Sequence, residues 1–272
     1  MKISSSFRQW FPPFLIDTVN NIFGNTIKFS SQVSSWDFAV RDCVGYDAAS
    51  ILNNVLDSTL KVKQGIASYE RDSVLFYKCE YDWSILSGLM FASARNSGRL
   101  NVLDFGGALG SSYFQHRGFL NELSEVRWNI VEQVHFVQAG RDYIQDKILR
   151  FYSSIPDCLS ENNPNVIFLS SVLQYLSDPF DILKSLMISN ADVLIIDKTI
   201  VNDSRSDRLY IQHVPDSIYK ASYPCWSLSE SKLIDAVSSH YLLKADFPSL
   251  SFPVLKLIKS EFKGYIFQRI VP

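Results

Sequence analysis

The most informative part of the sequence is a glycine-rich segment, VLDFGGALGSS, at residues 102–112. A short apolar run ends at Asp104, and Gly106, Gly107 and Gly110 follow it. Glycines at these positions would let the backbone pass close to a ligand, and backbone N–H groups at the start of the next helix could donate hydrogen bonds to it. Asp104 could fix the turn or accept a hydrogen bond from a ligand amine. The segment predicts a ligand-binding turn, and a turn with a purely structural role is the alternative.

An acidic residue, Glu132, ends the next apolar run and is followed by Gln133. A carboxylate at the end of an adjacent strand can accept hydrogen bonds from both vicinal hydroxyls of an adenosine ribose. A surface glutamate is the alternative. Starting at Gly106, the dinucleotide pattern Gly-x-Gly-x-x-Gly fails at Ala108 and Ser111, whereas the pattern Asp-x-Gly-x-Gly-x-Gly fails only at Ala108. The second pattern is typical of S-adenosylmethionine-dependent enzymes, so the segment resembles these, whose sulfonium ligand carries no phosphate, more than it resembles dinucleotide-binding proteins.

Two residues are candidates for the base that methyl transfer to a hydroxyl requires. His213, in LYIQHVP, is the first, because the ordinary pKa of histidine, about 6.5, suits a base at neutral pH. Asp197, which ends the fifth apolar run, is the second. The structural alternatives are a packed or solvent-facing histidine and an aspartate that caps a turn.

Three further residues are candidates for contact with the methyl acceptor. Lys198 could bind an anionic acceptor, and Arg71 could contact a carboxylate or phosphate on it. Arg71 belongs to the charged run 70–72, however, and such runs usually form a solvated surface. Tyr223, in the aromatic segment 217–226, could form part of a wall for a sugar ring or could simply pack in the interior.

The sequence after residue 98 alternates short apolar runs with helical patterns, which predicts βαβ units and a mainly parallel sheet. The expected strands are residues 100–105, 127–132, 148–152, 165–171, 192–197, 241–247 and 264–270. Between the fifth and sixth of these, the polar and aromatic segment 198–228 is expected to be a long loop that shapes a site.

The sequence before residue 99 predicts helices. Residues 25–98 are expected to form an all-helical cap, with Trp36 and Trp83 in its core. Residues 1–24 carry an apolar helical stripe that ends at Gly24, which predicts an amphipathic helix. That helix could dock on the rest of the protein or lie at a membrane interface. The expected domains are therefore 1–24, 25–98 and 99–272.

The composition excludes several classes of function. The chain has 272 residues, 47% of them hydrophobic, and its 26 basic and 28 acidic residues give a net charge of -2. This balance predicts a folded protein without the basic surface that nucleic acid requires. The four cysteines and four histidines show no metal-ligand spacing, and scattered cysteines are typical of reduced, cytoplasmic proteins. No apolar run approaches the ~18 residues that span a bilayer. We therefore expect no metal and a cytoplasmic location, with peripheral attachment to the inner face of the membrane as a further option.

Several motifs carry a resemblance to a known family. They are YERDSVLF (69–76), VLDFGGALGSSYFQ (102–115), VEQ (131–133), LRFY (149–152), SSVLQYLSDP (170–179), IIDKT (195–199) and SYP (222–224). Residues 99–272 resemble class I S-adenosylmethionine-dependent methyltransferases, and the chain from about residue 33 onward is similar to bacterial methyltransferases associated with surface-polysaccharide gene clusters. The resemblance implies an α/β fold with a Rossmann-like seven-stranded sheet, whose last strand runs antiparallel, and an N-terminal helical cap.

The resemblance also implies roles for individual residues. The turn after Asp104 would contact the methionine portion of S-adenosylmethionine and Glu132 its ribose, while Ser171 would flank the cofactor. Phe151 or Tyr152 would pack on the adenine. The implied activity is O-methylation of a sugar or glycan terminus in O-antigen or capsule biosynthesis. Two alternatives stay open, a catalytically silent cofactor-binding module of a polysaccharide assembly machine and an NAD-dependent oxidoreductase, which the failed dinucleotide spacing disfavours.

Overall fold

The computed structural model describes residues 27–43, 48–71, 73–213, 221–249, 255–256 and 258–270. The expected helix 1–24 lies outside these residues, as do Asp72 and Tyr219. The chain divides into two compact units. The small unit comprises Met1–Tyr46, Ile200–Lys232 and Pro248–Phe262, and the large unit comprises Asp47–Thr199, Leu233–Phe247 and Lys263–Pro272. The expected domains 1–24, 25–98 and 99–272 stay a prediction.

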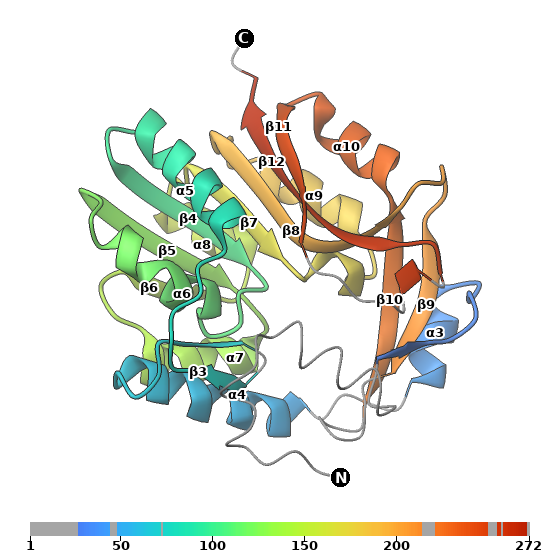
Figure 1. The fold of residues 1–272 in the computed structure, drawn as a ribbon, viewed down its shortest axis with the longest axis horizontal. Helices are drawn as coiled ribbons and strands as arrows, with labels where there is room; N and C mark the ends of the chain where they lie inside the picture. Colours follow the sequence, from blue (N-terminus) through green and yellow to red (C-terminus); the bar gives the residue numbers. More distant parts are fainter. Residues whose placement is uncertain are drawn as a thin grey trace. The chain divides into compact units, whose positions relative to one another are not determined.

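The large unit is built on a mainly parallel sheet (Figure 1). Its parallel strands lie side by side in the order β6, β5, β4, β7, β8. β12 pairs with β8 and with β11. The strands are β4 (Arg99–Phe105), β5 (Glu125–Val131), β6 (Leu149–Tyr152), β7 (Val166–Ser170), β8 (Val193–Asn202), β11 (Tyr241–Pro248) and β12 (Glu261–Arg269).

The last strand runs against its neighbours. The backbone N–H of Arg269, at the end of β12, donates to the carbonyl oxygen of Asp192, just before β8 begins. The N–H of Ile270 likewise donates to the carbonyl of His240, just before β11. β12 is therefore antiparallel to both strands, and the order of strands confirms the expected Rossmann-like sheet. All seven strands predicted after residue 98 are present, with ends shifted by a few residues.

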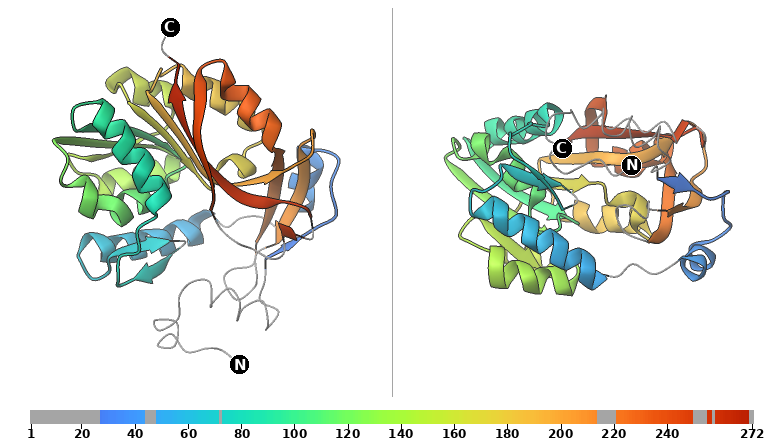
Figure 2. Two further views of the ribbon diagram at one scale, coloured as in Figure 1. Left: turned by 45° about the horizontal axis from the view of Figure 1, so that its top comes forward. Right: turned by 60° about the horizontal axis from the view of Figure 1, so that its bottom comes forward.

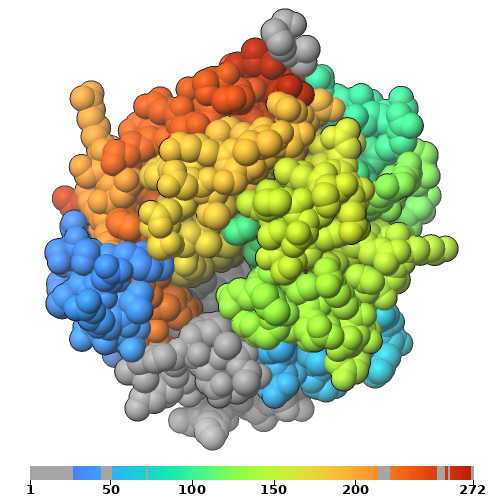
Figure 3. All heavy atoms as spheres, turned by 180° about the vertical axis from the view of Figure 1, so that it is seen from behind, coloured from blue at the N-terminus to red at the C-terminus, as the bar shows by residue number. Residues whose placement is uncertain are grey.

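Helices cover both faces of this sheet, and its central strands are therefore buried. All residues of Val166–Leu169 and Val193–Asp197 are buried. α8 packs on β5 and β6 and, with α9, forms part of the surface in Figure 3. The helices are α4 (Ala48–Lys63), α5 (Trp83–Arg95), α6 (Ser111–Leu120), α7 (Val134–Ala139) continued by the π-helical turn η1 (Gly140–Ile144), α8 (Ile155–Glu161), the 3₁₀ turn η2 (Leu173–Tyr175), α9 (Pro179–Met187) and α10 (Glu230–Ser238).

The expectation that residues 25–98 are all-helical is wrong. The predicted helices are present, and Asp82 caps α5 by accepting the N–H of Ile85. However, β2 (Tyr69–Arg71) and β3 (Val74–Phe76) form an antiparallel hairpin. Figure 2 shows this hairpin beside α4. The hairpin turns at Ser73, whose φ of 65° is left-handed. Strands of three residues are too short to show the alternation by which sequence predicts strands.

The small unit contains strands where a long loop was expected, so the expectation for 198–228 is also wrong. β10 (Ser222–Ser229) pairs antiparallel with β9 (Arg208–His213) and parallel with the last residues of β8. The two-residue strand β1 (Lys28–Phe29) extends the pairing at β9. Leu209 and Ile211 of β9 pack on Ala39 of helix α3 (Trp36–Asp42) in a small core. These strands form because segments distant in sequence supply their hydrogen-bond partners.

The two tryptophans expected in a helical core behave differently. Trp36 is partly buried and its ring stacks on Trp226 at a centroid distance of 6.0 Å. The expectation for Trp83 is wrong, because 64% of it is exposed. Its ring contacts Tyr81 and Phe119 at the surface. Its position on a helical stripe therefore does not show which face the rest of the protein covers.

Two features that the sequence did not predict, a membrane-spanning helix and a metal site, can be examined in the described residues. None of their helices is both long and apolar enough to cross a membrane. They also contain no group of three or more metal-ligating side chains that could hold a metal ion. All four cysteines are free.

Candidate functional site

The glycine turn follows β4 at the carboxyl edge of the parallel sheet. Gly106 and Gly110 have φ values of 75° and 98°, which favour glycine. The N–H of Gly106 donates to the carbonyl oxygen of Val131, the last residue of β5, at 2.9 Å. Ala108 also lies in the left-handed region, at φ 49°. A β-carbon at Gly110 would lie 2.9 Å from Leu149 Cδ2, so this glycine is needed for packing as well.

The protein's own side chains explain the other two glycines. A β-carbon at Gly106 would lie 2.6 Å from Cγ2 of Val172, and one at Gly107 would collide with the carboxyl group of Asp104. The sequence analysis ascribed these glycines to the approach of a ligand. The structure gives internal packing as a sufficient reason, so the glycines alone do not identify a binding turn.

Asp104 lies buried beneath the turn, with 1% of its surface exposed. Its Oδ2 accepts a hydrogen bond from Nε1 of Trp128 at 2.8 Å. Burial raises the pKa of Asp104 to about 7; the Trp128 hydrogen bond opposes this rise and the charge of Glu132 adds to it. The Asp104 carboxyl group is therefore engaged with Trp128 and packed against Gly107.

Glu132 lies directly against the turn. Phe105 and Val131 are paired residues of β4 and β5, so the turn and Glu132 begin at the same edge of the sheet. The Glu132 carboxylate accepts a hydrogen bond from the backbone N–H of Gln133 at 2.6 Å. Burial raises the pKa of Glu132, and the backbone N–H groups of Gln133 and Ala108 oppose this rise. The structure thus brings together the acid and the turn that the sequence singled out separately.

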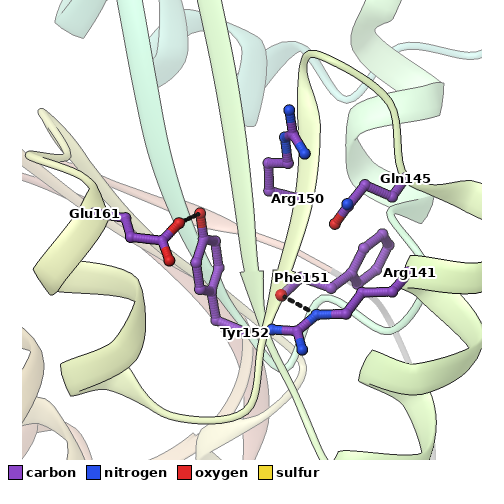
Figure 4. A pocket seen from close by; sticks show the side chains of 6 residues that line it. All are labelled: Arg141, Gln145, Arg150, Phe151, Tyr152 and Glu161. Carbon is purple, nitrogen blue, oxygen red and sulfur yellow. Dashed lines mark hydrogen bonds between the residues drawn. The ribbon is translucent and has the colours of Figure 1, made fainter.

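Tyr152 ends β6, next to Glu132, whose N–H donates to the Tyr152 carbonyl at 3.1 Å. The Tyr152 hydroxyl donates to Glu161 Oε2 at 3.1 Å and accepts from Nδ2 of Asn162 at 2.9 Å. Figure 4 shows Tyr152 and Glu161 at the cavity beside β6. This cavity has a volume of about 170 Å³ and is lined by Arg141, Gln145, Arg150, Phe151, Tyr152 and Glu161. Packing of Phe151 or Tyr152 on an adenine stays a prediction.

Two residues with strained backbone lie close together, one directly after β7 and one within β8. Ser171 and Lys198 have φ values of 57° and 48°, which are uncommon for residues other than glycine. The N–H of Ser171 donates to the carbonyl of Asp197 at 3.0 Å. Gln174, which is fully buried, donates from Nε2 to the carbonyl of Lys198 at 3.0 Å. Strained residues of this kind cluster at functional sites, and here both lie beside the carboxyl end of β7, whose last residue, Ser170, pairs with Asp197 of β8.

Asp197 and Lys198 form an ion pair. Lys198 Nζ lies 2.6 Å from Asp197 Oδ2 and 3.5 Å from Asp82 Oδ2. The Asp197 side chain is fully buried and also accepts from the hydroxyl of Ser170 at 3.1 Å. A base role for Asp197 and an anion-binding role for Lys198 would each require this pair to rearrange. Both roles stay predictions.

His213 and Tyr223 belong to the small unit. His213 ends β9, is exposed and pairs with Ser222 of β10. The Tyr223 hydroxyl accepts a hydrogen bond from Gln212 Nε2 at 3.2 Å. The role of His213 as a base and that of Tyr223 in binding the acceptor both stay predictions.

Glu70 and Arg71, the two described residues of the charged run 70–72, do not form the expected solvated surface. Arg71 donates to Oε1 of Gln115 at 3.2 Å. Glu70, to which the sequence analysis gave no separate role, has only 1% of its surface exposed. Its carboxylate accepts hydrogen bonds from the hydroxyl of Ser111, the first residue of α6, and from the N–H of Ser73 at 3.1 Å. The residues around Glu70 in the sequence are mostly polar or charged, so they gave no local signal of its burial.

No protein-family model and no curated protein matches the chain. Among solved structures it is similar to the magnesium protoporphyrin IX methyltransferase of Synechocystis PCC 6803, with 9% identity over 93% of this chain and 97% of the other and a TM-score of 0.45. It is also similar to CalS10, an amino pentose methyltransferase of Micromonospora echinaspora (8% identity, 70% and 92% coverage, TM-score 0.44). A third similar structure is that of an S-adenosylmethionine-dependent methyltransferase of Clostridium acetobutylicum ATCC 824, with 11% identity over 67% of this chain and 89% of the other and a TM-score of 0.43. These likenesses concern the arrangement of the chain and assign no activity.

Proposed function

We propose that this protein is an S-adenosylmethionine-dependent methyltransferase that methylates a hydroxyl oxygen. One observation carries the proposal. Glu132, which directly follows β5, and the turn after β4 begin at the same edge of the sheet, where the N–H of Gly106 donates to the carbonyl oxygen of Val131 at 2.9 Å. An acid and a glycine turn at the ends of adjacent parallel strands form the arrangement that binds a nucleoside at the carboxyl edge of a Rossmann-like sheet.

The charges near the turn support a cationic ligand. Asp104 and Glu132 are both acids whose pKa is raised by burial, and buried Glu70 lies at the start of the following helix. A phosphate group would be repelled by this group of carboxylates. A sulfonium and an ammonium group would stabilise their ionised forms instead. The residues present therefore fit S-adenosylmethionine better than a dinucleotide.

The protein's residues would divide the work in the following way. Glu132 would hold the two ribose hydroxyls in place of its backbone partners, and Asp104 would keep the turn in shape through Trp128. The donor supplies a methyl group on a positively charged sulfur, so the enzyme mainly aligns this group with the acceptor. A base would accept the hydroxyl proton, for which His213 and Asp197 are the candidates.

The acceptor that we propose is a sugar or glycan terminus in O-antigen or capsule biosynthesis. This part of the proposal rests on the resemblance of the motifs between residues 69 and 224 to bacterial methyltransferases of surface-polysaccharide gene clusters. Arg71, Lys198 and Tyr223 remain the candidates for contact with the acceptor. The test is transfer of a labelled methyl group into glycan extracts, and labelling of lipid or protein fractions alone would contradict it.

Calorimetry with S-adenosylhomocysteine tests the cofactor. We expect the native protein to bind it and Glu132→Gln to bind it at least about tenfold more weakly, because a ribose hydroxyl loses a charged acceptor. Glu125→Gln is the matched control, since Glu125 lies at the opposite end of β5 in an exposed ion pair with Arg127. Absence of binding to the native protein, or equal binding by the two variants, would contradict the proposal.

A catalytically silent cofactor-binding module is the second candidate function. The ion pair between Asp197 and Lys198 favours it, because the aspartate is already engaged. This reading predicts that S-adenosylhomocysteine binds while no glycan, lipid or small hydroxyl compound becomes methylated. Any turnover that depends on Glu132 would exclude it.

Attachment at the inner face of the membrane is a further part of the proposal, through the segment 1–24. Its test is co-sedimentation with liposomes. The full-length protein should pellet with vesicles that contain anionic lipid, and the protein without residues 1–24 should stay in the supernatant. Equal pelleting of the two would exclude this segment as an anchor.

A further inference from the structure

We propose that the cavity beside β6 binds a phosphate group through Arg141 and Arg150. Both arginines line this cavity, which lies in the large unit and has a volume of about 170 Å³ (Figure 4). A cavity needs only about 10–15 Å³ to hold one water molecule. The cavity beside β6 therefore has room for a phosphate group together with part of the molecule that carries it. This second ligand is independent of the proposed methyl transfer.

The local fold holds Arg141 in place at the cavity. A β-carbon at Gly140 would lie 2.5 Å from Cδ1 of Phe151, so the π-helical turn η1 packs directly on β6 at this glycine. Arg141 follows Gly140, and its Nε donates to the carbonyl oxygen of Phe151 at 3.0 Å. Lys63 Nζ secures the end of the turn by donating to the carbonyl oxygen of Ile144 at 2.8 Å. The π-helical turn, a conformation that is frequent at functional sites, thus fixes the first guanidinium group.

Both arginines keep N–H groups that a ligand can use. An arginine side chain has five N–H donors, and the Phe151 carbonyl engages only Nε of Arg141. Within the described residues, no acceptor or carboxylate contacts the terminal nitrogens of Arg141 or the guanidinium group of Arg150. Both side chains are exposed, so a dissolved anion can reach them. Arginine binds phosphate oxygens through paired, charge-assisted hydrogen bonds, and two arginines together suit a doubly charged phosphate.

Two acids near the cavity do not neutralise these arginines. Glu161 lines the same cavity, but its carboxylate accepts the hydroxyl of Tyr152 at 3.1 Å. In Figure 4, the Tyr152 side chain lies between Glu161 and the two arginines. Asp142, the chain neighbour of Arg141, accepts instead from a side-chain amide one helical turn earlier, at 2.9 Å. The cavity therefore presents two arginines against one glutamate, a surplus of positive charge.

The competing explanation is that the arginines only protect the edge of the sheet. β6 is the last strand at its end of the sheet and pairs with β5. Charged side chains at such an edge prevent pairing with another chain. That role requires charge alone and produces no saturable binding of phosphate. One phosphate bound per chain, with an affinity that depends on both arginines, therefore separates a binding site from edge protection.

The experiment is calorimetric titration of the full-length protein with inorganic phosphate at fixed ionic strength. We expect one phosphate per chain and a dissociation constant of about 1 mM or below. Arg141→Gln and Arg150→Gln should each weaken binding at least about tenfold, because each removes a charged donor. Arg99→Gln is the matched control and should leave the affinity unchanged. Exposed Arg99 also donates from Nε to a backbone carbonyl, that of Asn96, but it does not line the cavity.

A second measurement identifies the source of the phosphate group, which can belong to a dissolved molecule or to a lipid headgroup. The probes are vesicles of phosphatidylcholine with and without phosphatidic acid. Stronger pelleting with phosphatidic acid that is lost in Arg150→Gln would assign the site to a lipid headgroup. Equal pelleting of the native protein and Arg150→Gln, together with binding of free phosphate, would assign it to a dissolved phosphorylated compound.

Three results would overturn the proposal. The native protein could fail to bind phosphate saturably, or Arg99→Gln could weaken binding as much as Arg150→Gln, which would indicate general surface charge. Displacement of phosphate by S-adenosylhomocysteine would show that the cavity belongs to the donor site. Should Arg141→Gln unfold, Arg150→Gln still decides, because the Arg150 guanidinium group supports no described contact. Since the phosphate titration needs no methyl donor, failure of the proposed function would leave this test intact.

Discussion

Replacement of Asp104 by asparagine should change how the stability of the protein depends on pH. Asp104 is buried, and burial raises its pKa from an ordinary 3.8 to about 7. An acid whose pKa is higher in the folded state is preferentially protonated there. Its ionisation therefore costs folding free energy, and this cost appears as the pH rises from the unfolded pKa to the folded one. Asparagine stays neutral, and its side-chain oxygen can still accept the hydrogen bond of Trp128.

The size of the effect follows from the shift. A change from 3.8 to about 7 corresponds to about 4 kcal/mol at about 1.36 kcal/mol per pKa unit. This value is an upper limit, because relaxation around a buried carboxylate reduces its cost. We expect Asp104→Asn to gain between about 1 and about 4 kcal/mol relative to the native protein between pH 4 and pH 8.

The assay is urea denaturation of both proteins at pH 4.5, 6 and 8. The difference between their free energies of unfolding isolates Asp104, because every other titratable group is common to both proteins. The steric cost of the amide adds the same offset at every pH, so the test is how the difference changes with pH and not its absolute size. A difference that stays flat across this range, or that favours the native protein as the pH rises, would refute a raised pKa for Asp104.

Three further predictions concern the same site. Ala108→Gly should stabilise the protein by up to about 1 kcal/mol in thermal or urea denaturation, because Ala108 has a left-handed φ of 49°; Ser97→Gly, at φ 55°, is the matched control for strain outside the turn. Binding of a cationic donor should release protons from Asp104 and Glu132, because burial raises the pKa values of both acids in the free protein. Calorimetry in buffers of different ionisation enthalpy should detect this proton release. The affinity for the donor should therefore rise between pH 6 and pH 8. His213→Ala should lower the rate of methyl transfer at least about 100-fold without changing cofactor affinity if His213 is the base.

Each of these predictions has an outcome that contradicts it. A loss of stability in Ala108→Gly with a gain in Ser97→Gly would show that the Ala108 side chain contributes packing that outweighs its strain. Proton uptake on binding would mean that the two acids are not stabilised in their ionised form by the ligand. A rate within a few-fold of native in His213→Ala would remove this residue as the base.

Some features of the fold were predictable because their causes are local. Each strand from β4 to β8 is a short apolar run followed by a turn, and a helix follows the glycines as the sequence predicts. The pairing of turn and acid was also predictable, because parallel strands that are adjacent in a βαβ unit end at the same edge. The resemblance of the motifs added the direction of the last strand, which the chain confirms.

Other features depend on contacts between distant segments. The strands β9 and β10 exist because they pair with each other and with β8, and the hairpin β2–β3 is too short to show a pattern. The sequence also could not tell which side of a helix is covered, so Trp83 was expected inside and is exposed. Glycines at 106 and 107 were attributed to a ligand, and the side chains that require them come from Val172 and Asp104.

The sequence by itself thus determined the parallel sheet, the glycine turn and the acid beside it, because hydrophobic periodicity and turn chemistry act over a few residues. Only the tertiary structure decided that Glu70 is buried at the start of α6, that Asp197 is paired with Lys198, and that Asp104 supports the turn from below. A charged side chain has the same local sequence whether it meets water or another segment. Its burial, and with it its pKa and its partners, is set by the parts of the chain that fold against it.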